Sequence, residues 1–159
     1  MSVTHVSYEA EGWGVGELVL AGGRVVWHEL PRPRPAEHVT DCNLELVGRL
    51  QAYFAGEPVG FEDVAVDLEY ETPFLERCAH SLREIPRGEV VTYGELAALA
   101  GAPGAARAAG SFCARNRLGL LVPCHRVVSA GGLGAYGSQG VEYKRRLLAL
   151  EGYAGAAVR

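Results

Sequence analysis

Cys124 and His125 are neighbours in the stretch Pro-Cys-His-Arg, and together they have the side chains that a nucleophilic thiol and its base require. The stretch follows the apolar run Leu118–Val122 and leads toward a glycine-rich segment, so we expect a rigidly held sulfur beside a segment that can wrap a substrate. A free thiol has a pKa near ~8.5, and a polarised imidazole raises the small thiolate fraction present at neutral pH. A structural cysteine is the ordinary alternative, and the other motifs of the chain must decide between the two.

Length and composition indicate a globular protein of one domain or two small ones. The chain has 159 residues, of which 48% are hydrophobic and 21% are charged, and this is enough for a substantial core. No apolar run is long enough to span a membrane, and the first residues do not begin a secretory signal. The cysteines form no C-x-x-C pair and no zinc-ligand spacing, so we expect reduced thiols and a cytoplasmic location. They are Cys42, Cys78, Cys113 and Cys124.

The net charge of −4 combines two halves of opposite sign. Residues 1–78 carry 5 basic and 14 acidic side chains, whereas residues 79–159 carry 10 basic and 5 acidic ones. A basic half on an acidic protein indicates an anionic partner, with nucleic acid as the first candidate. Solvated surface arginines are the alternative explanation of the split.

Local patterns predict a small α/β domain at the amino terminus. Residues 14–21 and 24–30 flank Gly22-Gly23 as a β-hairpin. Residues 43–54 have apolar side chains at helical spacing, and residues 64–70 alternate like a strand. We expect this domain to cover residues 1–72.

The second half predicts a mostly α-helical domain over residues 73–159. Thr72 and Pro73 have the residue types of a helix cap and first helical position, and that helix should run to about residue 85. Thr92 and Glu95 form a capping box for a short helix. A tight turn at 101–104 and a second helix over 105–115 complete a candidate helix-turn-helix.

The second of these two helices is unusually rich in small residues, with Arg107 as its one long side chain near the start. Such a helix fits the narrow minor groove of DNA, although an alanine-rich packing helix of the core has a similar composition. A loop over 131–140 with five glycines is either a connector or a lid. In the last helix, over 142–150, we expect Lys144, Arg145 and Arg146 to be exposed.

These motifs resemble those of the O6-alkylguanine-DNA alkyltransferases, also called methylated-DNA–protein-cysteine methyltransferases. The likeness covers residues 72–152, with several separate motifs in the same order, and the amino-terminal part agrees with the family in length and in its hairpin. The matching motifs are Thr72–Phe74, Ile85–Glu89, Thr92–Gly94, Ala105–Ala108, Asn116, Pro123–Val127 and Leu147–Gly152.

The resemblance implies a DNA-repair protein that works once. It would bind alkylated double-stranded DNA through the helix-turn-helix in the minor groove, with little sequence preference, and flip the damaged base. It would move the alkyl group from O6-alkylguanine, and from O4-alkylthymine, onto its own cysteine. We expect a monomer with no cofactor and no membrane contact. Zinc occurs in some family members, but the candidate ligands here have no recognisable spacing, so we expect no metal: His5, His28, His38 and Cys42.

The resemblance also implies roles for individual residues. Cys124 would accept the alkyl group, His125 would be its base through a water, and Glu151 would hydrogen-bond to His125. Asn116 would bridge the active-site strand and the helix-turn-helix. Tyr93 would help to rotate the nucleotide and donate a proton to the leaving guanine.

Arg107 would fill the gap that the flipped base leaves, and the other DNA contacts would come from the helix cap and the small residues. These are Thr92, Ala105, Ala106, Ala108 and Gly110. The implied contacts of the base pocket are the backbone of Val127, Tyr136 and Ser138. Cys113 departs from the family pattern, because an apolar residue is usual there on the recognition helix.

Three other functions compete with repair. A related class binds alkylated guanine without repairing it and has a tryptophan in place of the cysteine, so Cys124 argues against it. A Cys-His-Glu hydrolase would turn over repeatedly and would need neither DNA nor Arg107. A regulator that reads DNA sequence would need side chains for base edges, which the small-residue helix lacks.

Overall fold

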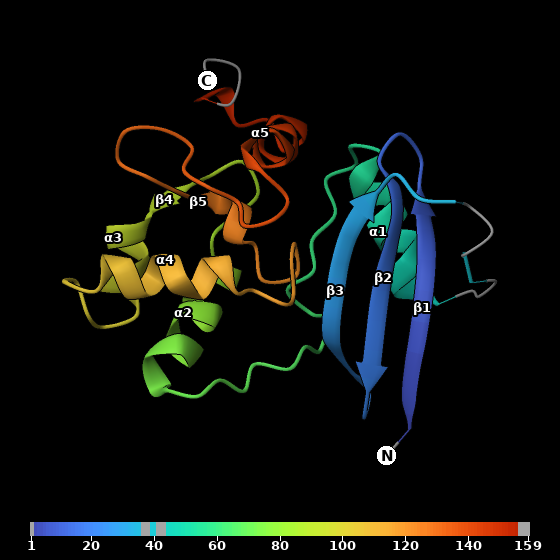
Figure 1. Cartoon of the computed structure of the whole chain (residues 1–159), viewed down its shortest axis with the longest axis horizontal. Helices are drawn as coiled ribbons and strands as arrows, with labels where there is room; N and C mark the ends of the chain where they lie inside the picture. The colour runs from blue at the N-terminus through green and yellow to red at the C-terminus, as the bar shows by residue number, and fades with distance from the viewer. Residues whose placement is uncertain (1, 36–38, 41–43, 156–159) are drawn as a thin grey trace. The chain divides into compact units, whose positions relative to one another are not determined.

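A three-stranded antiparallel sheet of order β1-β2-β3 forms the framework of the amino-terminal part (Figure 1). Its strands are β1 (Val3–Ala10), β2 (Gly14–Ala21) and β3 (Arg24–Arg32). The predicted hairpin is confirmed, because Gly22 and Gly23, with φ of 60° and 78°, join β2 to β3. Positive φ at both central residues gives the turn whose twist matches that of the strands.

Helix α1 (Glu45–Phe54) packs against the sheet through β1. Its buried face includes Leu50 and Tyr53, which are fully buried, and the indole nitrogen of Trp13 donates to the carbonyl oxygen of Phe54 at 3.0 Å. The helix predicted over residues 43–54 is thus present from Glu45 onward. The structure, a computed structural model, describes residues 2–35, 39–40 and 44–155, so the expected first residue of this helix lies outside the described residues.

The predicted strand over residues 64–70 is wrong. Only Val66 forms an isolated bridge, with Val25 of β3. The outer edge of β3 is shared, since the amide of His28 donates to the carbonyl oxygen of Arg117 at 2.9 Å. Residues 64–70 and the segment around Arg117 therefore each contact only a short part of β3, and neither forms a strand.

The chain divides into two compact units, Met1–Asp67 with Arg117–Leu121, and Leu68–Asn116 with Val122–Arg159. The first long segment ends at Asp67, five residues before the predicted boundary. Residues 117–121 therefore belong to the unit of the sheet, whereas the prediction from the sequence assigned them to the carboxy-terminal domain. In this segment Leu120 has a φ of 71°, and the amide of Leu121 donates to the carbonyl oxygen of Gly119 at 2.9 Å. Together they form a γ-turn, which is strained when its central residue is not glycine.

His28 anchors residues 117–121 to the sheet. Its Nδ1 lies 2.6 Å from the carbonyl oxygen of Gly119, and its Nε2 lies 2.7 Å from the hydroxyl of Tyr8. A carbonyl only accepts, so Nδ1 carries the proton and Nε2 accepts from the tyrosine. Burial lowers the pKa of His28 to about 4, although the bond to Gly119 acts against this, so the ring is neutral near pH 7.

The second unit is mostly helical, and α2 (Pro73–Arg83), α3 (Tyr93–Leu99) and α4 (Ala106–Ala114) pack on one another (Figure 1). Both predicted caps are confirmed. The Thr72 hydroxyl accepts from the amide of Leu75 at 3.2 Å, and Thr92 and Glu95 form the capping box of α3.

Two short strands and one more helix complete this unit. Strand β4 (Val91–Thr92) pairs in parallel with β5 (Val127–Val128), and α5 (Val141–Leu150) follows the glycine-rich loop. Because the pairing is parallel, α3 begins at the end of β4 that lies beside the end of β5, and the Pro-Cys-His-Arg stretch enters β5 at the other end of this two-residue pair. The fold is thus α/β, as predicted. Within the described residues, no helix combines the length and hydropathy needed to cross a membrane.

Candidate active site

The backbone around Cys124 is held by short-range hydrogen bonds. Pro123 has φ −80° and ψ 68°, and the amide of Cys124 donates to the carbonyl oxygen of Val122 at 2.8 Å, which is the geometry of an inverse γ-turn. The same carbonyl accepts from the Asn116 side-chain amide at 2.8 Å. A 3-10 turn over Cys124–Arg126 follows, so the backbone of Cys124 is held on both sides.

His125, Glu151 and Arg126 form a buried polar cluster. The imidazole Nε2 lies 2.7 Å from Oε2 of Glu151, and Arg126 donates to both carboxylate oxygens at 2.9 Å. Burial raises the pKa of Glu151, but the hydrogen bonds and charges of His125 and Arg126 outweigh burial and hold it far below its usual value. The carboxylate is therefore ionised, and Nε2 of His125 donates to it.

The second nitrogen of His125 is the basic atom of this cluster. Burial lowers the pKa of His125 more than Glu151 raises it, so the imidazole is neutral near pH 7. With the proton on Nε2, Nδ1 has the free lone pair. Nδ1 is buried and has no hydrogen-bond partner among the described residues.

The thiol of Cys124 is almost fully buried, at 2% exposure. Burial raises the pKa of this thiol well above its usual value, and the neighbouring thiol of Cys113 raises it further by a side-chain hydrogen bond and by charge. A side-chain hydrogen bond from Asn116 and the charge of Lys144 lower it. The ionisation of Cys124 therefore depends on opposing neighbours.

Tyr93 is the first residue of α3 and is half-buried. A Cβ at Gly110 would lie 3.9 Å from its ring, and one at Gly134, where φ is +77°, would lie 3.1 Å from its hydroxyl. These two glycines allow α4 and the glycine-rich loop to approach the phenol. Burial, with the nearby thiols of Cys113 and Cys124, raises the pKa of Tyr93 to about 12.

Lys144 is fully buried, so the expectation that it is exposed is wrong. Its Nζ donates to the carbonyl oxygen of Ala135 at 3.0 Å and lies 5.7 Å from the centre of the Tyr93 ring. Leu147 and Leu148 lie three and four residues further on the same buried face of α5. Arg145 is half-buried and ion-paired with Glu142.

Cys113 and Lys144 are the site residues that the sequence analysis missed. Cys113 is a departure from the family pattern, which gives no indication of its partner. For Lys144 a signal existed, because Lys144, Leu147 and Glu151 follow the spacing of one helical face. The charge of Lys144 favours an exposed position, and that general rule misleads here.

The residues of the implied base pocket differ in exposure. The hydroxyl of Tyr136 is buried and has no hydrogen-bond partner among the described residues. Burial raises the pKa of Tyr136 well above its usual value, and the nearby Cys124 adds to this. Val127 is buried in β5, whereas Ser138 is exposed.

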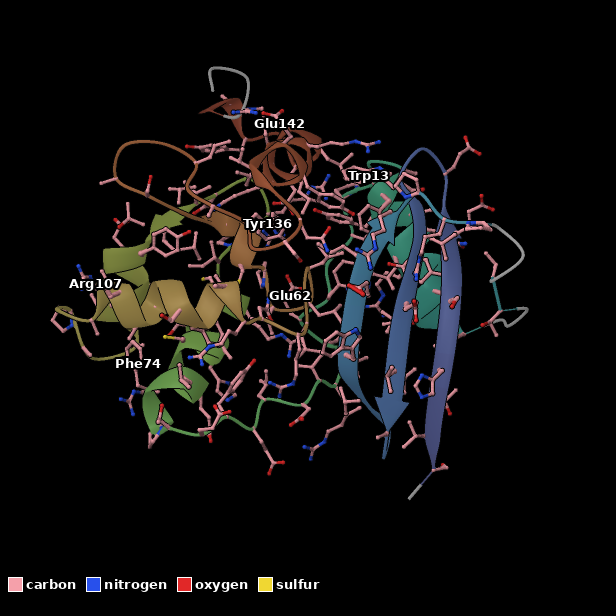
Figure 2. The ribbon with its side chains drawn as sticks, viewed as in Figure 1. Trp13, Glu62, Phe74, Arg107, Tyr136 and Glu142 are labelled. Atoms are coloured by element: carbon pink, nitrogen blue, oxygen red, sulfur yellow. The ribbon has the colours of Figure 1, made fainter. Side chains whose placement is uncertain are left out.

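Helix α4 has a buried side and an exposed side. Ala109 and Phe112 face the interior, whereas Arg107 and Ala108 are exposed, and Figure 2 shows Arg107 at the start of the helix. The other residues assigned to DNA contact are half-buried: Thr92, Ala105, Ala106 and Gly110. The exposed side of α4 therefore consists of small residues, with Arg107 as its one long, positively charged side chain.

Among the described residues, no group of three or more His, Cys, Asp or Glu side chains could hold a metal ion. Two of the considered ligands, His38 and Cys42, lie outside the described residues. His28 is bonded to Tyr8 and Gly119, as described above.

Comparison with known proteins finds methyltransferases among the relatives of this chain. The family model described as "6-O-methylguanine DNA methyltransferase, DNA binding domain" matches residues 73–153. The methylated-DNA–protein-cysteine methyltransferase of Mycobacterium tuberculosis is 50% identical over 106 residues, which are 66% of this chain and 62% of that protein. The match thus spans somewhat less than two thirds of that relative's length. The protein of the same name from Metallosphaera sedula is 43% identical over 118 residues, or 73% of each chain.

Solved structures agree with this relationship. The crystal structure of the M. tuberculosis O6-methylguanine methyltransferase has a TM-score of 0.76 at 38% identity, covering 94% of this chain and 93% of that one. The structure of the M. tuberculosis protein in complex with DNA has a TM-score of 0.78 at 37% identity, covering 96% and 95%. The chain belongs to the methylated-DNA–protein-cysteine methyltransferase family.

Proposed function

We propose that this protein repairs DNA by moving the alkyl group of O6-alkylguanine, and of O4-alkylthymine, onto the sulfur of Cys124. The observation that carries the proposal is the polar cluster next to the thiol, in which Glu151 fixes the tautomer of His125 and leaves Nδ1 as a free base. A neutral imidazole beside a thiol is the arrangement that activates a cysteine nucleophile.

The transfer begins with the Cys124 proton, which passes through a water to Nδ1 of His125. The imidazolium that forms is stabilised by the carboxylate of Glu151. The thiolate attacks the alkyl carbon, and an S–C bond forms as the bond between that carbon and O6 breaks. The guanine leaves with the bonding electrons as an anion.

Tyr93 donates a proton to the departing guanine. With its pKa raised to about 12, the phenol keeps its proton at neutral pH and can serve as the donor. We assign the base pocket to the backbone of Val127, with Tyr136 and Ser138. The product is a thioether, and no group in the proposed site can cleave it, so each molecule repairs one lesion.

For DNA, we propose that α3 and α4 act as a helix-turn-helix in the minor groove. The exposed small-residue side of α4 permits close approach, and Arg107 fills the gap after the damaged base is flipped. The helix cap at Thr92 and the backbone near Gly110 complete the contact. Because few side chains on α4 can reach base edges, we expect little sequence preference.

In this proposal the second unit, residues 68–116 with 122–159, has both the DNA contacts and the acceptor, and the unit of the sheet is the small α/β domain. All assigned site residues lie in the second unit, and we propose that a monomer is active. Cys78, Cys113 and Cys124 are free thiols, which fits the reducing cytoplasm.

The test is mass analysis of the peptide 118–126 after incubation with duplex DNA containing O6-methylguanine. We expect one methyl group on Cys124 for each lesion repaired. Cys78→Ala should retain transfer, whereas Cys124→Ala should abolish it and still bind the duplex. Repeated turnover with unmodified Cys124 would contradict the proposal and favour a hydrolase.

A further inference from the structure

We propose that the buried ammonium of Lys144 is the counter-charge of the Cys124 thiolate, which makes Lys144 a positioning residue of the site. The inference rests on the proposed role of Cys124 as acceptor. It concerns how a thiolate is stabilised in a place where burial opposes ionisation.

The first observation is that Lys144 is buried without a carboxylate partner. It is fully buried, its Nζ donates to the carbonyl oxygen of Ala135 at 3.0 Å, and none of the ion pairs found between described residues includes it. A buried ammonium is costly unless it is paired. A neutral carbonyl and the face of Tyr93 satisfy only part of that requirement.

The second observation is that the nearby carboxylate is already neutralised. Both oxygens of Glu151 accept from Arg126 at 2.9 Å, and one of them also accepts from His125 at 2.7 Å. Glu151 therefore balances the charge of Arg126 and leaves Lys144 without an anion from this cluster.

Besides the phenol of Tyr93, the acidic groups that act on Lys144 are thiols. Cys113 and Cys124 both raise the pKa of Lys144, although burial lowers it to about 8 overall. In return, the charge of Lys144 lowers the pKa of Cys124. The two groups thus stabilise each other's charged form, as a thiolate and an ammonium do.

The groups around Cys124 come from six places in the second unit. They are Cys113 on α4, Asn116 after α4, Lys144 on α5, Tyr93 on α3, Tyr136 in the glycine-rich loop and His125 in the same turn. Cys113, Tyr93 and Tyr136 are acids that are neutral when protonated, and Asn116 has no charge. His125 is neutral near pH 7, so Lys144 is the cation of this set.

Two variants separate the charge of Lys144 from its hydrogen bond. Lys144→Gln removes the charge and keeps an N–H donor for Ala135, whereas Lys144→Met removes both. Arg146→Gln removes one charge from an exposed position on the same helix and is the matched control. Thermal unfolding midpoints and circular dichroism confirm which variants are folded.

The measurement is the rate at which iodoacetamide modifies Cys124 as a function of pH, followed by mass analysis of peptide 118–126. We expect both Lys144 variants to shift the rate profile to higher pH by about one unit, so that modification at pH 7 is about tenfold slower. Arg146→Gln should leave the profile near that of the unchanged protein.

Each outcome decides the proposal. An unchanged profile in both folded variants overturns it, and so does a shift in Lys144→Met alone, which would assign the effect to the hydrogen bond. Because this assay uses no DNA, failure of methyl transfer in the unchanged protein would contradict the proposed function without affecting the shift.

Discussion

The thiol of Cys113, on α4, raises the pKa of the thiol of Cys124, the proposed acceptor, through hydrogen bonding and charge. Cys113 favours the protonated form of Cys124, because its sulfur accepts a hydrogen bond from the Cys124 thiol and because two adjacent thiolates would repel each other. The cysteine of α4 therefore holds back the ionisation that Lys144 and Asn116 favour.

Replacing Cys113 with valine should make Cys124 more acidic. We expect the pH profile of Cys124 modification to move to lower pH and the reaction at pH 7 to become severalfold faster. Cys78→Val, at a buried cysteine of α2, is the control. A profile that stays in place or moves upward would show that Cys113 does not limit ionisation.

Glu151→Gln should slow alkyl transfer while DNA affinity changes little. The amide oxygen can still accept from His125, but the charge of Arg126 is no longer balanced and makes the imidazole less basic. We expect transfer at pH 7 to fall by roughly 10- to 100-fold and the pH–rate curve to shift upward. The double variant Glu151→Gln with Arg126→Gln also removes the positive charge of Arg126, and we expect it to recover part of the transfer rate. Single-turnover rates across pH provide the measurement, and equal rates for the two variants would contradict this explanation.

Arg107→Ala should weaken binding to damaged duplex by about tenfold, because the gap left by a flipped base would be unfilled. Transfer from a free alkylated base should be unaffected. Arg115→Ala removes the same charge from beyond the other end of α4 and should weaken damaged and undamaged duplexes alike. Titration of both duplexes with each variant tests this, and normal repair of duplex by Arg107→Ala would refute the assigned role.

The unit that contains the sheet should lose stability in mild acid because of His28. Its folded pKa is about 4 and its unfolded value 6.5, so the unfolded chain binds the proton first as pH falls. The contribution of the buried, neutral His28 to the free energy of unfolding is complete above pH 6.5 and is lost progressively toward pH 4. It amounts to about 3 kcal/mol. Urea unfolding between pH 7 and 4 measures it. His28→Gln should flatten the dependence, whereas His5→Gln, at an exposed position, should not.

Elements with local signals could be predicted from the sequence. The Gly22-Gly23 turn, the cap at Thr72 and the box of Thr92 with Glu95 depend on residues within a few positions of one another. The pairing of His28 with Arg117 depends on residues far apart in the chain, so no local pattern indicated that residues 64–70 would lose their strand partner.

The site was predictable where the reactive side chains are neighbours in the sequence, as Cys124 and His125 are. Lys144 was misjudged because charge usually indicates exposure, and only its periodicity with Leu147 and Glu151 pointed inward. Cys113 had no local signal at all, since its contact with Cys124 arises from how α4 packs.

Because residues 117–121 belong to the unit of the sheet, the order of synthesis affects how the protein can fold. The unit of the sheet is incomplete until Leu121 has been synthesised, and Cys124 is only three residues further along. On the ribosome, most of the second unit is therefore translated before the first can close, which departs from the usual domain-by-domain order. A fragment that begins at residue 73 would lack His28, the partner of both Arg117 and Gly119. Studies of isolated halves should retain this segment together with the sheet.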